Sequence, residues 1–98
     1  MNLEELITGK KVVLLDFYAT WCGPCMAMMP VLDRLKIDFG DNLHIIKIDV
    51  DKNLDFAVDQ KVMGVPMFIL LVDGKEVWRE AGTFTATFLS TVIGKFQQ

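Results

Sequence analysis

The sequence has few of the residues that build disulfide-rich or metal-dependent scaffolds. Its 98 residues include two cysteines and one histidine, His44. A secreted domain held together by disulfides needs several bridges, which excludes that class. A structural zinc ion needs about four ligands, and His44 lies far along the chain from Cys22 and Cys25. The pair therefore indicates redox chemistry, with a zinc half-site or two small buried hydrophobes as the alternatives.

Long apolar runs and an excess of positive charge are also missing. No apolar run approaches the ~20 residues that cross a bilayer, and the formal net charge is −3. Without a basic stripe to neutralise phosphates, nucleic acid is not an expected partner, and neither is a membrane. The N-terminus carries Glu4 and Glu5, whereas a secretory signal begins with basic residues. We therefore expect a soluble, cytoplasmic protein, with a mature exported form as the alternative.

The chain does contain many apolar residues, arranged in short runs. They make up 52% of the sequence and alternate with segments of helical periodicity, with no repeat or linker. A chain of this length has room for one core. The sequence therefore predicts a single α/β domain over residues 1–98.

Four segments have the character of β-strands. Residues 12–18 form an apolar run typical of a central strand, in which Asp16 is out of place. Further strands are expected at residues 43–50, 67–72 and 76–80. Asp73 and Gly74 favour a tight hairpin turn, so the last two strands should run antiparallel. A mixed sheet of about four strands, flanked by helices, is the expected core.

Helical segments are expected around these strands. Asn2 and Glu5 have the spacing of a capping box, which predicts a short helix ending near Gly9. An amphipathic helix is expected from Cys22 to about Phe39, kinked at Pro30. Two more helices are predicted, over residues 54–61 after an Asn53 cap and following a Thr85 cap. In the last helix the residues expected to face the sheet are Phe88, Leu89, Val92, Ile93 and Phe96.

The two cysteines lie at the predicted N-terminus of the long helix, in the run Trp21-Cys22-Gly23-Pro24-Cys25. A thiolate is stabilised there by unpaired backbone N–H groups and the helix dipole. Cys25 follows Cys22 by about one helical turn, so it can resolve a mixed disulfide formed on Cys22. The spacing therefore favours thiol–disulfide exchange.

This run is one of several motifs that together resemble the thioredoxin family over nearly the whole chain. The matching positions are Asp16-Phe17-Tyr18-Ala19, Trp21-Cys22-Gly23-Pro24-Cys25, Pro30, Lys47, Asp51, Gly64-Val65-Pro66, Asp73-Gly74 and Gly82. The Trp-Cys-Gly-Pro-Cys string, followed by Val-Pro about forty residues later, is far more specific than a lone Cys-x-x-Cys. The resemblance implies the thioredoxin fold, in which the cysteines follow a central strand.

The resemblance also implies catalytic roles for individual residues. Cys22 is the attacking thiol, Cys25 the resolving thiol, and Asp16 the buried carboxylate that accepts a proton from Cys25. Lys47 matches a lysine that moderates the charge of this aspartate. The alternative for Asp16 and Lys47 is a buried ion pair without catalytic weight.

Substrate docking is implied for a second group of residues. Pro66 matches a cis-proline that faces the cysteines, and the Val65 backbone beside it can pair with an extended substrate. The alternative for Pro66 is an ordinary trans-proline at a strand start. The residues that the resemblance assigns to docking are Trp21, Gly23, Pro24, Val65, Pro66 and Gly82.

The activity implied by the resemblance is reduction of protein disulfides through the Cys22/Cys25 dithiol. No metal or bound cofactor is expected beside this redox-active pair, and the electrons are expected from an NADPH-dependent thioredoxin reductase. The Gly-Pro dipeptide between the cysteines resembles the reducing branch of the family. Two alternatives stay open: a compartment-specific reductase or oxidase of the same fold, and a binding module that retains its cysteines without using them.

The sequence departs from the family pattern in two places. Met26, Met63 and Met67 stand where many members have a basic or hydroxyl-bearing residue, and our hypothesis is that they form a soft apolar docking surface. Met28 and Met29 are expected in the core. The usual N-terminal edge strand is also missing, which leaves residues 43–50 at a sheet edge. We therefore expect a monomer that can associate through this edge at high concentration.

Overall fold

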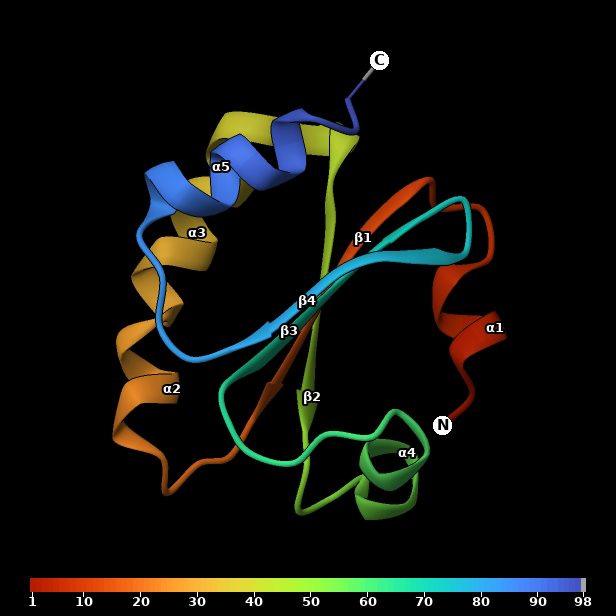
Figure 1. The fold of residues 1–98 in the computed structure, drawn as a ribbon, viewed down its shortest axis with the longest axis vertical. Coiled ribbons are helices and arrows are strands. Elements are labelled where there is room, and N and C mark those ends of the chain that lie inside the picture. The colour runs from red at the N-terminus through yellow and green to blue at the C-terminus, as the bar shows by residue number, and fades with distance from the viewer. Residues whose placement is uncertain (98) are drawn as a thin grey trace.

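The fold is built around a four-stranded mixed sheet (Figure 1). The computed structural model describes residues 1–97. In their spatial order the strands are β2 (His44–Asp49), β1 (Val12–Tyr18), β3 (Met67–Val72) and β4 (Lys75–Ala81). β1 and β2 are parallel, whereas β1 with β3 and β3 with β4 are antiparallel. The predicted mixed sheet of four strands is confirmed, and β2 lies at an edge of it as expected.

Helices cover both faces of this sheet. In Figure 1, α1 (Leu3–Ile7) and α4 (Leu54–Asp59) lie to the right of the strands. To the left lie α2 (Gly23–Ala27), α3 (Met29–Phe39) and α5 (Ala86–Gly94). A short 3₁₀ helix, Gly40–Asn42, leads from α3 into β2. Within residues 1–97, no helix has the length and apolar character needed to cross a membrane.

The side chains of β1 alternate between two core clusters. Val12 and Leu14 pack in a cluster with α3 and α5, whereas Val13 and Leu15 pack in a cluster with α1 and α4. Successive side chains of a strand point to opposite faces, so a strand covered on both sides needs an unbroken apolar run. The apolar run therefore marks the strand correctly, and the predicted boundaries, residues 12–18, are confirmed.

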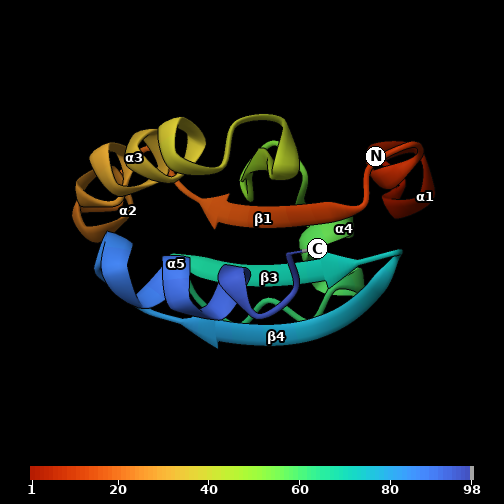
Figure 2. The same cartoon turned by 90° about the horizontal axis from the view of Figure 1, so that it is seen from above.

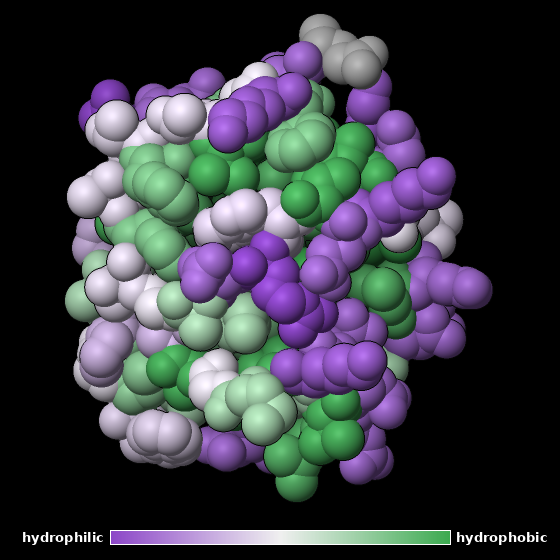
Figure 3. Space-filling model, viewed as in Figure 1, coloured by the Kyte–Doolittle hydropathy of each residue, from purple (hydrophilic) through white to green (hydrophobic). Residues whose placement is uncertain are grey.

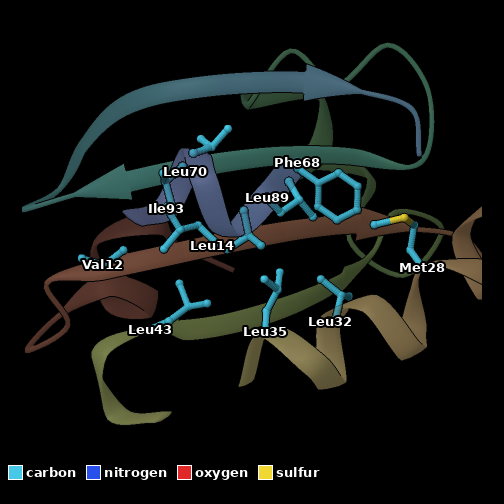
Figure 4. Packing of buried hydrophobic residues seen from close by; sticks show 11 residues of the cluster. Val12, Leu14, Met28, Leu32, Leu35, Leu43, Phe68, Leu70, Leu89 and Ile93 are labelled. Atoms are coloured by element: carbon cyan, nitrogen blue, oxygen red, sulfur yellow. The ribbon is translucent and has the colours of Figure 1, made fainter. Parts of the chain in front are cut away.

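The cluster on the α3 and α5 side fixes the helices that follow the cysteines. Leu32 of α3 and Leu89 of α5 point toward Leu14 and Phe68 of the sheet (Figure 4). All four residues are at most 1% exposed. Phe88, which we expected to face the sheet, is 45% exposed and instead stacks on Phe84. Phe88 is rotated by about 100° around α5 from Leu89, which places its ring at the rim of the cluster, against Trp78 and Phe84.

The single long helix expected from Cys22 to Phe39 is wrong: the structure has two helices, separated at Met28. Pro30 has no N–H to donate to the carbonyl of Met26, so the helical hydrogen-bond pattern cannot continue. The Met28 N–H bonds instead to the Cys25 carbonyl, three residues back, at 3.2 Å. The prediction that Pro30 perturbs the helix is confirmed, but the helix is interrupted rather than kinked. Cys25 therefore lies on a separate short helix, α2.

Two of the three predicted helix caps are confirmed. The Asn2 side chain accepts the Glu4 N–H at 2.8 Å, and the Thr85 hydroxyl accepts the Phe88 N–H at 3.0 Å. Asn53 precedes α4, but its side chain does not cap the helix and instead donates to the Asp49 carbonyl at 2.9 Å. Asn53 therefore stabilises the loop between β2 and α4 rather than the helix N-terminus.

Candidate active site

The two cysteines lie where the central strand ends. β1 runs toward α2, and a short loop connects them (Figure 2). Cys22 is the N-cap residue of α2, and a disulfide joins it to Cys25, with 5.2 Å between the Cα atoms. The structure therefore holds the oxidised form of the pair.

Both cysteines are buried, and Cys22 is slightly the more exposed of the two. Cys22 is 6% exposed and Cys25 is 1% exposed. The Cys25 N–H donates to the Cys22 Sγ at 3.2 Å, so this sulfur takes the place of a capping side chain. A donor at a helix N-terminus stabilises negative charge on the sulfur that accepts it. A Cβ added to Gly23 meets no atom within 4 Å, and Pro24 is exposed, so the surface beside Cys22 is open.

Trp21 is held in place beside Cys22 by a residue from another segment. Its ring is 71% exposed, and its Nε1 donates to the Asp51 carboxylate at 2.8 Å. The Asp51 N–H in turn donates to the Asp49 carboxylate at 2.9 Å. Asp51 belongs to the family resemblance, but the sequence alone assigned it no role. Its role is to orient the indole at the mouth of the site.

The loop that precedes β3 lies against the cysteines. Val65 packs against the cluster that contains Cys22 and Cys25, and the Val65–Pro66 peptide bond is cis. The predicted cis-proline is confirmed, and the trans alternative is wrong. Gly82 has a φ of +116°, a backbone conformation that glycine adopts readily, and its N–H donates to the Pro66 carbonyl at 2.9 Å. Gly82 thus holds the loop from the β4 side.

Asp16 is buried in β1 without a hydrogen-bond partner for either carboxylate oxygen. Strand alternation places its side chain on the same face as Leu14, toward α3. Burial raises the pKa of Asp16 from 3.8 to about 6, and the charge of Lys47 opposes part of this rise. Lys47 is the strand partner of Asp16 on β2 and is exposed. The alternative of a buried, satisfied ion pair is therefore wrong.

An apolar groove of about 230 Å³ opens beside Trp21. Its main lining residues are Trp21, Leu54, Val58, Val62, Met63 and Val65. Leu54 and Val58 are 63% and 65% exposed, and Figure 3 shows hydrophobic surface at the lower edge of the molecule, over α4. Trp21, Met63 and Val65 were predicted to contact substrate, whereas Leu54 and Val58 were not. The available signal was the spacing of Leu54 and Val58, which places both on the side of α4 turned away from the buried Phe56.

The five methionines near the site in sequence divide between surface and core. Met63 is 94% exposed and Met26 is 40% exposed, whereas Met28 is 2% exposed and belongs to the core, as expected. Met29 is half-buried and packs against the same cluster. Met67, expected on the docking surface, is 8% exposed and packs in the second core cluster. The prediction for Met67 is wrong because this residue begins β3, and its side chain points to the face of the sheet that α4 covers.

Metal-ligating side chains do not gather in this site. Within the described part of the chain, no three His, Cys, Asp or Glu side chains come together in a way that could hold a metal ion. A zinc ion bound by Cys22 and Cys25 needs about two further ligands. The zinc half-site therefore finds no support in the structure.

Thiol–disulfide exchange requires a reachable sulfur that is stabilised as a thiolate and a second sulfur within bonding reach of it. Cys22 at the start of α2 and Cys25 behind it meet both requirements. The fold and this site together define a protein of the thiol–disulfide oxidoreductase class.

Comparison with known proteins gives the family. A thioredoxin family model matches residues 1–95. The thioredoxin of Bacillus subtilis (strain 168) is 42% identical over 88 residues, which cover 90% of this chain and 85% of that protein. Chloroplastic thioredoxin X of Arabidopsis thaliana is 46% identical over 92 residues, which cover 92% of this chain and 50% of that protein. This chain thus spans about half the length of that chloroplastic relative.

The likeness extends to solved structures. A thioredoxin variant from Halobacterium salinarum NRC-1 matches with a TM-score of 0.88 and 34% identity, over 98% of this chain and 83% of that chain. The chain belongs to the thioredoxin family.

Proposed function

We propose that this protein reduces disulfide bonds in other proteins by means of its Cys22/Cys25 dithiol. One observation carries the proposal: Cys22 caps α2 at an open surface, with the cis Val65–Pro66 loop packed against it. Trp21 links this point to the apolar groove. A protein substrate can therefore contact the groove while its disulfide reaches Cys22.

In the first step, the Cys22 thiolate attacks one sulfur of the substrate disulfide. A bond forms between Cys22 Sγ and that sulfur, and the other substrate sulfur leaves as a thiolate that takes up a proton. The Cys25 N–H that faces Cys22 Sγ favours the thiolate form of the attacking group. The product is a mixed disulfide between Cys22 and the substrate.

In the second step, the Cys25 thiol loses its proton and its sulfur attacks Cys22 Sγ. The bond to the substrate breaks, and the second substrate sulfur leaves as a thiolate. Asp16 is the proposed proton acceptor, because burial raises its pKa to about 6, closer to neutrality than that of an ordinary carboxyl. The exposed Lys47 stabilises the carboxylate between turnovers. The result is the Cys22–Cys25 disulfide that the structure contains.

Docking is proposed to use two kinds of contact. The Val65 backbone, held by the cis-proline and Gly82, pairs with an extended substrate segment as an added strand does. The groove and the exposed Met26 and Met63 accept apolar side chains on either side of the substrate disulfide. The methionine hypothesis is thereby kept for Met26 and Met63 and withdrawn for Met67.

An NADPH-dependent thioredoxin reductase is the proposed source of electrons that restores the dithiol. The site of action is proposed to be the cytoplasm, because the Gly-Pro dipeptide between the cysteines resembles the reducing branch of the family. Family membership leaves the compartment open, since the relatives include a bacterial and a chloroplastic protein.

Reduction of insulin by dithiothreitol tests the proposal directly. The wild-type protein should accelerate the reaction, and Cys22→Ser should abolish the acceleration. Cys25→Ser should instead accumulate mixed disulfides on Cys22, which non-reducing electrophoresis and mass spectrometry can identify. If the wild type does not accelerate the reaction, the domain is a binding module. If Cys22→Ser accelerates it as well as the wild type does, the acceleration does not depend on Cys22 and the proposed mechanism is wrong. The reduction potential distinguishes a reductase from an oxidase. A value of about −270 mV is typical of a reducing thioredoxin, and a value of about −120 mV is typical of an oxidase.

A further inference from the structure

The methionine side chains of this protein differ widely in their access to solvent. A thioether is oxidised only where the oxidant can reach its sulfur. Three methionines are exposed: Met63 at 94%, Met1 at 60% and Met26 at 40%. Two are buried: Met67 at 8% and Met28 at 2%. The Met28 sulfur also accepts the Phe84 N–H at 3.5 Å inside the core. Met63 is therefore the most accessible thioether.

Met63 also occupies a sensitive position. It lines the apolar groove together with Trp21 and lies two residues before Val65, which packs against the cysteine pair. The proposed function requires this groove to be apolar, because a docking substrate displaces water from it. A change of polarity at Met63 therefore acts on docking while leaving Cys22 and Cys25 untouched.

We propose that Met63 is a site of reversible oxidation, and that the resulting sulfoxide weakens the docking of protein substrates. The oxidant is a peroxide. Its O–O bond breaks, one oxygen forms a bond to the Met63 sulfur, and the other leaves as water. The sulfur loses two electrons and the peroxide gains them, so no further reactant is needed. The inference rests on the proposed function, since it concerns the same groove.

The sulfoxide changes the groove in a defined way. The S=O group is a strong hydrogen-bond acceptor, and the apolar residues around it, Trp21 and Val58 among them, offer no side-chain donor in the groove other than the indole N–H. That N–H already donates to Asp51. Docking then buries the sulfoxide oxygen without a partner, which is unfavourable. Substrates too small to fill the groove do not bury it and should be unaffected.

The experiment treats the protein in its disulfide form with hydrogen peroxide, so that the cysteines are protected. Peptide mapping by mass spectrometry then gives the extent of oxidation at each methionine. We expect Met63 to be oxidised before Met26, with Met28 and Met67 protected. After removal of peroxide, kcat/KM for insulin should fall by about tenfold in proportion to Met63 sulfoxide, mainly through KM. The value for a small aromatic disulfide should stay within about twofold.

Two variants and a reversal step separate this effect from general damage. Met63→Leu keeps the apolar volume but cannot be oxidised at this position. Its kcat/KM for insulin should be the same before and after a peroxide exposure that peptide mapping shows to leave Met26 intact. Met63→Gln places a polar group at the same position and should show a raised KM without any treatment. Methionine sulfoxide reductases of both stereospecificities should restore the treated wild type.

The outcomes distinguish the inference from the function on which it rests. If the untreated protein does not reduce insulin, the proposed function is wrong. If it does, but complete oxidation of Met63 leaves KM unchanged, or Met63→Leu loses activity on treatment as the wild type does, the inference is overturned. Preferential oxidation of Met28 or Met67 while Met63 stays intact also overturns it.

Discussion

Asp16 is an acidic residue in a strand that is otherwise apolar, and its protonation is coupled to folding. Below pH 3.8 the carboxyl is protonated in the folded and the unfolded chain alike, so the stability it contributes is fully present. As the pH rises from 3.8 to about 6, the unfolded chain loses the proton first, and stability falls. Above about 6 the loss is complete. The shift corresponds to about 3 kcal/mol at about 1.4 kcal/mol per pH unit.

Asp16→Asn should therefore stabilise the oxidised protein in a pH-dependent way. The amide has nearly the same shape but never ionises, so the variant avoids the burial of a charge. The free energy of unfolding of the variant minus that of the wild type should rise by up to about 3 kcal/mol between about pH 4 and pH 7.5. Urea unfolding at several pH values measures it. The exposed Asp41→Asn serves as the control, and parallel curves for Asp16→Asn and wild type contradict the prediction.

At this scale the sequence allowed the chemistry of the site to be predicted but not all of its contacts. Cys22 and Cys25 are adjacent in a short motif, and Asp16 interrupts an apolar run, so both can be found by inspection. Trp21 and Asp51 are 30 positions apart, and their hydrogen bond depends on how β2 and the loop after β1 are placed. Met67 was misassigned because it follows the Val65–Pro66 segment beside the cysteines in sequence, whereas its side chain packs in the second core cluster.

At the scale of elements, Arg79 joins β4 to the end of α4. Its Nη1 donates to the Gln60 carbonyl at 2.7 Å, and its Nε and Nη2 pair with the Glu76 carboxylate at 3.0 and 2.9 Å. The hydrogen bond from Arg79 lowers the pKa of Glu76. Lys61, which follows Gln60, has a φ of +59° and turns the chain into the loop that leads to Val65. Arg79 thus helps to position the loop of residues 61–66, which leads into β3 and contains the Val65–Pro66 docking segment.

Arg79→Met should loosen this loop. It removes the donor to a partly buried carbonyl, which costs about 1–2 kcal/mol in stability. Hydrogen exchange at residues 62–65 should become faster, and KM for insulin should rise severalfold with little change in kcat. Arg79→Lys, which can make one of the lost bonds, should recover part of both effects.

A matched arginine elsewhere on the surface provides the control. Arg34 pairs with Asp38 on α3 and is 67% exposed, so Arg34→Met should change stability by less than about 0.5 kcal/mol and leave exchange in the loop as it is. Equal effects of the two substitutions mean that Arg79 contributes only as a surface charge, contrary to our expectation.

Element boundaries were predictable where a local signal decides them. Asp73 and Gly74 have φ angles of +50° and +81°, which is the turn that this dipeptide favours, and Thr85 caps α5. The break at Met28 was missed because periodicity continues through it, although Pro30 alone prevents a continuous helix. Asn53 has the residue type of a cap, but a competing partner, the Asp49 carbonyl, binds its side chain.

At the scale of the whole molecule, the sheet has two edges of different character. β4 carries charged residues at both ends, Lys75 and Glu76 at one and Arg79 and Glu80 at the other, which discourages pairing with another chain. β2 has Lys47 exposed but also presents half-buried Ile45 and Ile46 beside its free edge. The net charge of −3 opposes contact between copies at neutral pH. Association through β2 is therefore the expected behaviour when repulsion is reduced.

Sedimentation velocity at about 1 mM protein should show weak self-association, stronger at about pH 5 than at about pH 7.5, because protonation of carboxylates brings the net charge nearer to zero. Ile46→Glu adds a charge at the β2 edge and should suppress the association, provided that circular dichroism shows an unchanged fold. Val77→Glu makes the same change on β4, where it should have less effect, because that edge is already charged. A sedimentation profile of monomer alone at both pH values, or equal suppression by the two variants, rules out β2 as the contact. The comparison works because both variants carry the same net charge, so any difference between them comes from which edge of the sheet is altered.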